Sequence, residues 1–463
     1  MSAELHFAID EEMHQRLTAL LLRNQPEEEV CFALISASTG NTRRTLIIRD
    51  IIEPAPGERE VHGNVSFSAP FVDRAIDAAI DAGTGLALVH SHPFGVGFQR
   101  PSIDDRRAEA RTADTAAFAL PGKPIAGIIL SGDGTLSGRE YSFTSPGAAP
   151  TIQENDATRV VGRHLVMQRR GQALAPLADV HRSQVGLFGR MGQPVLAGLK
   201  VGVVGVGSVG GWVALQLARM GVGVVGGTDY DHVEARNLNR LPAFPDDVGL
   251  RKVLVSAREA KRAATASAFK FLPLVASIVE EDGARAARDF DVLFSCADSH
   301  WSRQVLNAIS YAHLIPVIDG GTAIRSAAGA FQTASFRTQV TGPGRGCLEC
   351  GRGFDPAAIG EEMAGIVAPH YAPDDPRLVG EPSVIALNSA LASFEVMRFM
   401  ELVLRIADER ELPAQRFDYR GGDVQLEPVE CRSTCVWAKT TGLGDGAVLP
   451  LGVDPRFERA RAA

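Results

Sequence analysis

The first residues whose types and spacing could do chemistry form the motif His-Ser-His-Pro at positions 90–93. Side chains alternate between the two faces of a strand, so His90 and His92 would point the same way and could share one metal ion. Asp105, at the start of the next expected helix, could provide a third ligand. Three such ligands with an open fourth position are typical of catalytic zinc, which lowers the pKa of a bound water toward ~7. A base must then take the proton of that water, and Glu29 is the candidate.

Each of these residues also has a structural explanation. Ser102-x-x-Asp105 is a helix N-terminal capping pattern, in which Asp105 would only complement the helix dipole. A His-x-His pair can be structural, and the three adjacent glutamates at 27–29 would normally form a solvated face. Capping and metal binding are compatible, and the order of all these elements along the chain favours a metal site.

This order resembles that of the JAMM (MPN/JAB) metallo-isopeptidases over about Asp10 to Tyr141. In that family a glutamate on the first strand precedes His-Ser-His-Pro and Ser-x-x-Asp. The resemblance implies that the two histidines and Asp105 bind zinc, that Glu29 acts as general base and acid, and that Ser102 helps to bind the oxyanion. Glu29 stands at the family position, although any of the three adjacent glutamates could serve. The implied reaction is hydrolysis of a peptide or isopeptide bond after the C-terminal glycine of a carrier protein.

The second group of residues has the features of a nucleotide site. Gly205-x-Gly207-x-x-Gly210 follows an apolar strand and opens a helix. The first two glycines let backbone N–H groups approach phosphate, and the third lets the helix pack closely on the strand. Asp229 ends the next strand, at the distance where an acidic residue accepts hydrogen bonds from ribose hydroxyls. These features alone fit an NAD-linked oxidoreductase equally well.

A basic series followed by a late carboxylate favours adenylyl transfer over hydride transfer. Attack at an α-phosphate requires cations to neutralise the developing charge and a carboxylate to hold Mg²⁺. Each basic residue alone could be a solvated surface charge, but the ordered set favours a function. The set consists of Asn237, Arg240, Lys252 and Asp298.

The set is similar to that of the ThiF/MoeB group of ubiquitin-activating-like adenylyltransferases, over about Arg182 to Arg398. The resemblance implies an ATP site in which Mg²⁺ is bound and a C-terminal glycine carboxylate becomes an acyl-adenylate. The substrate would be a ubiquitin-like or sulfur-carrier protein, and the family acts as dimers, which implies a homodimer. The implied roles are ribose binding by Asp229, triphosphate contacts by Asn237, Arg240 and Lys252, magnesium binding by Asp298, and contact of Arg182 with the partner subunit's nucleotide.

The six cysteines indicate how far such a pathway goes. Cys347-x-x-Cys350 and Cys431-x-x-x-Cys435 have the spacing of a closed structural zinc site, with disulfides as the alternative. The two remaining cysteines, Cys31 and Cys296, lie in apolar strands and are typical of small buried hydrophobic residues. The segment 351–382 contains no cysteine that could attack the adenylate. We therefore expect the enzyme to stop at the acyl-adenylate and transfer it to another protein, with Cys296 as the only candidate for a covalent step.

Hydrophobic periodicity predicts the elements that position these residues. Helices are expected at 10–23, 69–82 and 102–119 and strands at 30–37, 45–52, 85–92 and 125–130, giving an α+β metalloprotease domain over 1–145. A linker is expected at 146–160, with a helical pattern over 156–191. Strands and helices then alternate, which predicts an α/β Rossmann-like parallel-sheet adenylation domain with a Cys₄ zinc knuckle over 161–445. Residues 446–463 are expected to form a loose tail.

Composition limits the remaining classes of function. The net charge of −8 argues against non-specific nucleic-acid binding, and the sequence shows neither a signal peptide nor a convincing membrane span, so we expect a cytoplasmic protein. The leading hypothesis is a bifunctional enzyme of a prokaryotic ubiquitin-like or sulfur-carrier system that cleaves a carrier precursor or conjugate and adenylates the exposed glycine. The alternatives are adenylation of a short peptide or small acid in natural-product synthesis, a non-catalytic scaffold, and a dinucleotide oxidoreductase.

Overall fold

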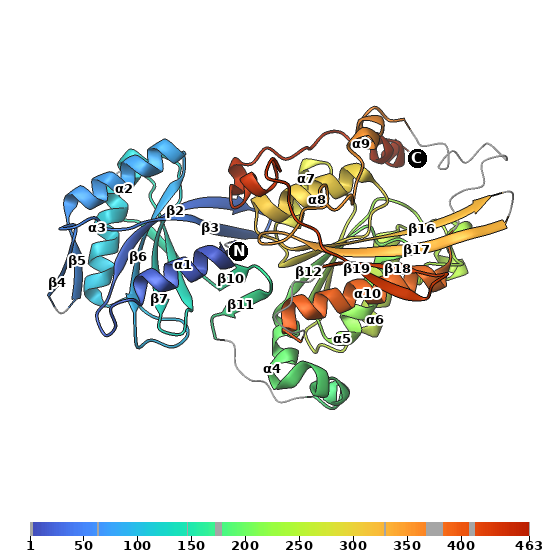
Figure 1. The fold of residues 1–463 in the computed structure, drawn as a ribbon, viewed down its shortest axis with the longest axis horizontal. Helices are drawn as coiled ribbons and strands as arrows, with labels where there is room; N and C mark the ends of the chain where they lie inside the picture. Colours follow the sequence, from blue (N-terminus) through green and yellow to red (C-terminus); the bar gives the residue numbers. More distant parts are fainter. Residues whose placement is uncertain are drawn as a thin grey trace. The chain divides into compact units, whose positions relative to one another are not determined.

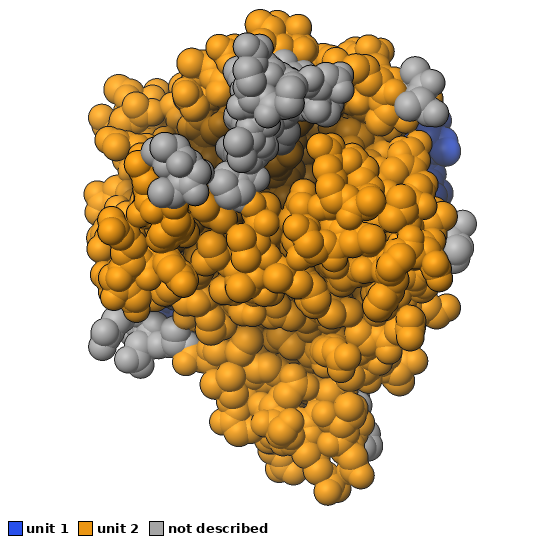
Figure 2. All heavy atoms as spheres, turned by 90° about the vertical axis from the view of Figure 1, so that its right-hand side faces the viewer, with its two compact units in different colours: residues 1–172, 312–314, 440–448 blue, residues 173–311, 315–439, 449–463 orange. Residues whose placement is uncertain are grey.

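The computed structural model describes residues 3–62, 64–145, 147–171, 178–327, 330–366, 383–406 and 413–462. The chain divides into two compact units (Figure 2). Unit 1 consists of residues 1–172, 312–314 and 440–448, and unit 2 consists of the remaining residues. None of the helices in the described ranges is both long enough and apolar enough to cross a membrane.

Unit 1 is built on one mixed sheet with the strand order β11-β10-β1-β3-β2-β6-β7-β8-β9. A separate hairpin is formed by β4 (Arg59–His62) and β5 (Asn64–Phe67), and the helices are α1 (Glu11–Leu21), α2 (Ala69–Ala82) and α3 (Ile103–Ala119). The sheet strands are β1 (Glu4–Asp10), β2 (Val30–Thr39), β3 (Arg43–Ile52), β6 (Gly85–His92), β7 (Ile125–Ser131), β8 (Leu136–Ser142), β9 (Thr151–Glu154), β10 (Ala157–Val161) and β11 (Leu165–Arg169).

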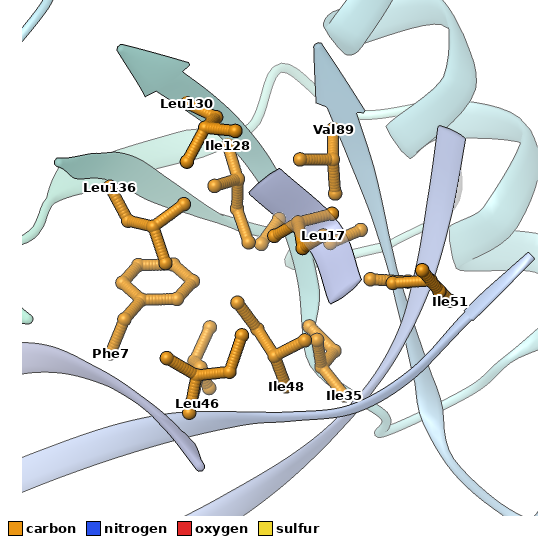
Figure 3. Packing of buried hydrophobic residues seen from close by; sticks show 14 of the residues in the cluster. Phe7, Leu17, Ile35, Leu46, Ile48, Ile51, Val89, Ile128, Leu130 and Leu136 are labelled. Carbon is orange, nitrogen blue, oxygen red and sulfur yellow. The ribbon is translucent and has the colours of Figure 1, made fainter. Parts of the chain in front are cut away.

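The two faces of this sheet bury separate hydrophobic clusters. Leu17 of α1 packs on one face with Ile48, Val89 and Leu130 (Figure 3). On the other face, α2 and α3 pack against a cluster that includes Val30. Neighbouring residues of a strand point to opposite faces of the sheet. A strand residue in one cluster therefore faces the helices of that cluster, and the residues next to it in the strand face the other side.

Unit 2 has an eight-stranded sheet with the order β14-β13-β12-β15-β16-β17-β18-β19. The pairs from β14 to β16 are parallel, and those from β16 to β19 are antiparallel. The strands are β12 (Lys200–Val204), β13 (Val224–Thr228), β14 (Lys270–Leu274), β15 (Val292–Ser295), β16 (Val317–Ala327), β17 (Ala330–Thr341), β18 (Ala414–Asp418) and β19 (Asp423–Glu427). The Rossmann-like parallel half agrees with the sequence prediction.

Helices cover both faces of the second sheet, with α5, α6 and α10 on one side and α7 and α8 on the other (Figure 1). A 3₁₀ turn at Asp179–Gln184 precedes the first of them. The helices are α4 (Val185–Gly198), α5 (Gly210–Met220), α6 (Lys252–Ala263), α7 (Glu281–Ala287), α8 (His300–Ala312), α9 (Pro356–Met363), α10 (Ile385–Leu404) and α11 (Pro455–Ala462).

Three sequence predictions at the ends of these units were wrong. Residues 146–160 are not a linker, because β9 and β10 lie there and extend the sheet of unit 1. The helical pattern expected over 156–191 is also wrong in its first part, where β10 and β11 lie. β10 carries Thr158, Val160 and Val161, whose branched side chains favour strands. The segment 446–463 is also not loose, since it ends in α11 and Phe457 of that helix is buried.

Candidate zinc and nucleotide sites

The end of β6 and the start of α3 bring together the three predicted metal ligands of unit 1. Nε2 of His90 and Nε2 of His92 each lie 3.5 Å from Oδ2 of Asp105. Two ligands about 2.0–2.1 Å from a tetrahedral zinc are separated by about 3.4 Å, so this spacing fits a single shared ion. The three side chains are largely buried, and their ligand atoms lie within 4.8 Å of one another.

The capping interaction predicted for Ser102 is present and holds the same carboxylate. Oγ of Ser102 accepts a hydrogen bond from the Asp105 amide at 3.1 Å, and Oδ2 of Asp105 accepts one from the Ser102 amide at 2.7 Å. Burial opposes ionisation of Asp105, but the neighbouring imidazoles hold its pKa below the usual range. The hydrogen bond that His92 donates to Asp105 in turn raises the pKa of His92. Capping and metal binding therefore use one carboxylate, and the cap fixes its direction.

Glu29, the predicted base, is buried and contacts neighbouring side chains. It precedes β2 and is opposite Ser91, and like Cys31, two residues on, it lies on the α1 side of the sheet. Its buried carboxylate accepts a hydrogen bond from Nδ2 of Asn24 at 2.6 Å and pairs with Nε of Arg59 at 2.7 Å. These contacts hold the carboxylate in a network of side chains, and the assignment of Glu29 as the base stays a prediction.

Glu28 is a second candidate for the base. It lies two residues before Val30, the strand partner of His90. Its charge acts on His92 and contributes, after the Asp105 hydrogen bond, to the raised pKa of that imidazole. Glu28 is half-buried.

The glycine-rich turn of unit 2 links β12 to α5. Gly205 has a φ of +83°, and a Cβ there would lie 2.9 Å from the Ala297 backbone nitrogen. A Cβ on Gly210 would lie 1.9 Å from the carbonyl oxygen of Gly205, so the third glycine is needed for close packing, as predicted. Gly207 has no neighbour within 4 Å of such a Cβ, which leaves open space beside its backbone for a ligand.

Asp229 is held by the glycine turn immediately after β13. Its Oδ2 accepts a hydrogen bond from the Val206 amide at 3.0 Å, and its Oδ1 accepts one from the Asp231 amide at 2.8 Å. Burial raises the pKa of Asp229 to about 6, although the charge of Lys252 acts in the opposite direction. The carboxylate is thus positioned at the floor of a cleft, where it can accept hydrogen bonds from a bound sugar.

This cleft has a volume of about 730 Å³ and brings together most of the predicted nucleotide residues. Nζ of Lys252 pairs with Oδ2 of Asp231 at 2.8 Å, and the carboxylates of Asp229 and Asp231 keep the pKa of Lys252 raised in spite of its burial. Nε of Arg240 donates to Oγ of Ser208 at 3.0 Å. The predicted residues that line the cleft are Gly205, Gly207, Asp229, Asn237, Arg240, Lys252 and Asp298.

Arg182 lies outside the cleft of its own chain. It is exposed on the 3₁₀ turn and pairs with Asp179 at 2.9 Å. This position leaves its predicted role toward a partner subunit's nucleotide as a prediction. Conversely, the sequence analysis missed Arg456 of α11, which lines the cleft and lies 3.5 Å from the carboxylate of Asp298. No sequence motif marks that arginine, because only the fold brings it to the cleft.

The four paired cysteines converge in unit 2. Sγ of Cys347 lies 3.6 Å from Sγ of Cys435, and all four sulfurs lie within 4.8 Å of one another. Two thiolates about 2.3 Å from a tetrahedral zinc are separated by about 3.8 Å, so the spacing fits zinc and is too long for a disulfide bond. Hydrogen bonds from neighbouring thiols, first that of Cys347, lower the pKa of Cys431 to about 5, as thiolate coordination requires. The cluster consists of Cys347, Cys350, Cys431 and Cys435.

Cys296 lines the cleft but lacks the environment of a nucleophile. Burial, the charge of Glu395 and a 3.7 Å hydrogen bond to it raise the pKa of the Cys296 thiol. Burial also raises the pKa of Glu395 well above its ordinary value. The thiol would therefore stay protonated at neutral pH, which supports the expectation that no covalent intermediate forms there. Cys31 is buried in β2, where burial likewise raises its pKa.

Comparisons with known proteins agree with this geometry for unit 2. A phosphate-binding turn, a buried acidic residue after the next strand and a basic cleft define a Rossmann-like nucleotide-binding domain. The family model "ThiF family" matches residues 181–433, and the chain belongs to the ThiF family. The match leaves the first 180 residues unassigned.

Similar curated proteins include ubiquitin-like modifier-activating enzyme 5 of Drosophila virilis, which is 32% identical over 146 residues, 28% of this chain and 36% of that protein. The enzyme of the same name from Drosophila persimilis is 29% identical over 181 residues, 37% of this chain and 46% of that protein. The chain thus spans about a third to a half of the length of these relatives. Among solved structures, E. coli MccB with ATP has 18% identity and a TM-score of 0.43, covering 56% of this chain and 74% of that chain.

Proposed function

We propose that unit 2 adenylates the C-terminal glycine carboxylate of a ubiquitin-like or sulfur-carrier protein with ATP and Mg²⁺. The observation that carries the proposal is the cleft itself, in which the glycine turn, Asp229, Lys252 and Asp298 line one cavity of about 730 Å³. Membership of the ThiF family and the partial similarity to ubiquitin-like modifier-activating enzymes support this choice over hydride transfer.

The residues of the cleft would have different roles in adenylyl transfer. Asp229 would accept hydrogen bonds from the ribose, while backbone amides of the glycine turn would face the phosphates. An oxygen of the substrate carboxylate attacks the α-phosphorus, the bond to the β-phosphate oxygen breaks, and pyrophosphate leaves with the electron pair. Arg240 and Lys252 would neutralise the charge that develops on the phosphates. Mg²⁺ held by Asp298 would supply further neutralisation when it is bound.

We propose that unit 1 is a zinc hydrolase that cleaves a carrier precursor or conjugate after the same glycine. Zinc held by His90, His92 and Asp105 would lower the pKa of a bound water toward ~7. Glu28, in place of Glu29, would take the proton of that water and return it to the leaving amine. Ser102 would remain available at the helix start to assist binding of the oxyanion, as the JAMM resemblance implies.

The two activities would act in sequence on one substrate class, since cleavage exposes the carboxylate that adenylation uses. The low reactivity expected of Cys296 favours transfer of the acyl-adenylate to a separate acceptor protein. A homodimer remains part of the proposal, with Arg182 reaching the partner subunit's nucleotide.

The test is ATP–pyrophosphate exchange with zinc-loaded full-length protein and a panel of small carrier proteins that end in glycine. Exchange is expected only with a free C-terminal carboxylate, so the same carriers with an amidated terminus are the matched controls. Lys252→Ala should abolish exchange, while Asp105→Ala, in the other unit, should leave it unchanged. No exchange with any carrier would contradict the proposal, and exchange with short peptides alone would favour the alternative of peptide modification.

A further inference from the structure

The C-terminal segment of unit 2 is fixed beside the nucleotide cleft. Oδ2 of Asp454 accepts a hydrogen bond from Oγ of Ser277 at 2.6 Å, and the Asp454 amide donates to Oε1 of Glu280 at 3.0 Å. The ring of Phe457 is 3% exposed and stacks on Tyr230, with 4.9 Å between the centroids and 27° between the planes. Tyr230 directly follows Asp229, so these contacts hold α11 against a residue of the cleft.

The same segment is anchored before the helix begins. Nε1 of Trp301 on α8 donates to the Pro450 carbonyl at 2.6 Å. The Gly452 amide donates to the Val279 carbonyl at 2.9 Å. These contacts therefore fix the position of the start of α11, and with it the backbone of Arg456 at the wall of the cleft.

Arg456 extends from α11 into the part of the cleft that contains the acidic residue expected to hold magnesium. Nη1 of Arg456 lies 3.5 Å from Oδ1 of Asp298, and the arginine side chain is about two-thirds buried, with 31% exposed. The ammonium group of Lys252 also interacts electrostatically with Asp298. Two cations thus converge on the carboxylate of Asp298, while Asp454 and Glu362 also act electrostatically on Arg456.

We propose that Arg456 is a phosphate-binding catalytic residue, supplied by the C-terminal helix of the same chain, that contacts the β- and γ-phosphates of ATP. This inference rests on the proposed function of unit 2. A guanidinium presents a planar set of donors that matches phosphate oxygens and does not lose its charge at any relevant pH. In the reaction, its charge neutralises the pyrophosphate as the bond between the α-phosphorus and the bridging oxygen breaks. No proton transfer and no additional reactant are needed for this role.

A phosphate-binding role and a merely structural role of Arg456 have different expected effects on the binding of ATP and AMP. A residue at the β- and γ-phosphates affects ATP binding but leaves AMP binding unchanged, because AMP lacks both groups. Arg456→Ala should weaken ATP binding by about ten-fold to a hundred-fold, the range expected for a lost charge-assisted contact. Arg456→Lys keeps the charge without the planar donors, so it should recover part of that affinity.

The experiment is calorimetric titration of the zinc-loaded full-length protein with ATP and with AMP, each in the presence of Mg²⁺. Arg461→Ala is the matched control, since Arg461 lies on the same helix and pairs with Glu280 at 3.3 Å but does not line the cleft. Hydrogen exchange of the segment 449–462 checks that α11 stays packed in each variant.

Three results would overturn the inference. Equal losses of ATP and AMP affinity in Arg456→Ala would indicate that the arginine only supports the fold of the cleft. Unchanged or tighter ATP binding would indicate that it is a spectator or a competitor for Asp298. An equal loss in Arg461→Ala would assign the effect to the helix as a whole. In each of these three cases, normal ATP binding by the wild-type protein would leave the proposed function of unit 2 intact. If the wild-type protein did not bind ATP, both the proposed function and the role of Arg456 would be refuted.

Discussion

Exchanging Glu28 and Glu29 separately for glutamine tests which face of β2 carries the chemistry of unit 1. Glu28→Gln should abolish hydrolysis and leave stability and zinc content unchanged, because the half-buried carboxylate would be lost only as a base. Glu29→Gln should lower stability and leave the site intact. Both variants preserve side-chain shape, so each serves as the matched control of the other.

The expected cost of Glu29→Gln follows from its contacts. The carboxylate is 1% exposed, and it holds the Asn24 amide at 2.6 Å and the Arg59 guanidinium at 2.7 Å. Hydrogen bonds to charged groups contribute about 1.5–3 kcal/mol each, but Arg59 is 20% exposed and could be partly rehydrated. The ion pair with Arg23, at 3.4 Å, adds little to stability because the Arg23 side chain is 42% exposed. We therefore expect a loss of about 2–3 kcal/mol in the free energy of unfolding of unit 1.

Hydrogen exchange is the suitable assay, because Trp212, Trp301 and Trp437 all lie in unit 2 and do not report on unit 1. The most protected amides of β2 should exchange about 30-fold to 140-fold faster in Glu29→Gln. Hydrolysis is measured on a fusion protein whose scissile bond follows the glycine of a carrier, and zinc content by atomic absorption. The reasoning is refuted if Glu29→Gln keeps its protection but loses hydrolysis, or if Glu28→Gln keeps hydrolysis.

Four further outcomes are expected. Because an ionised Asp229 must accept the ribose hydrogen bonds, its raised pKa of about 6 should make ATP affinity increase between about pH 5 and pH 7, and Asp229→Asn should bind weakly at every pH in a titration series. The same raised pKa means that the folded state favours the protonated form, so this group should reduce stability as pH rises above the ordinary value of 3.8, with the loss complete near pH 6. Cys435→Ser should lower bound zinc from about two to about one per chain and destabilise unit 2, as seen by tryptophan fluorescence; unchanged zinc would count against the Cys₄ site. Asp105→Ala should remove the other zinc without changing ATP affinity, and retention of both ions would reject the ligand assignment in unit 1.

The predictions from sequence were most accurate where one local pattern determines the structure. The boundaries of α2 and β6 match the structure residue for residue, since Pro70 and Gly83 bound the helix and a continuous apolar run defines the strand. The predicted metal ligands meet because strand alternation fixes one histidine relative to the other, and a cap fixes Asp105.

The failures have a common physical cause, which is that tertiary contacts selected among locally acceptable alternatives. Periodicity does not reveal that β10 pairs with β1, a strand about 150 residues away, although this pairing decides that the segment is extended. Glu28 and Glu29 are identical in type and adjacent, so the sequence alone does not reveal that Glu29 contacts Asn24. A one-residue difference in strand position moves a side chain to the opposite face.

The nucleotide cleft contains residues that the sequence predicts and one residue that it does not predict. The glycine turn, Asp229 and Asp298 follow β12, β13 and β15, which are adjacent parallel strands, so their carboxyl ends meet at one edge of the sheet. That rule allows the cleft to be assembled from residues that lie up to about 90 positions apart in the sequence. Arg456 follows no strand of this sheet, and its place depends on the stacking of Phe457 on Tyr230 and the anchoring of Asp454. A structure therefore adds most to a family assignment at residues that docked segments bring to a site, and here the added residue is a cation in the lining of the cleft.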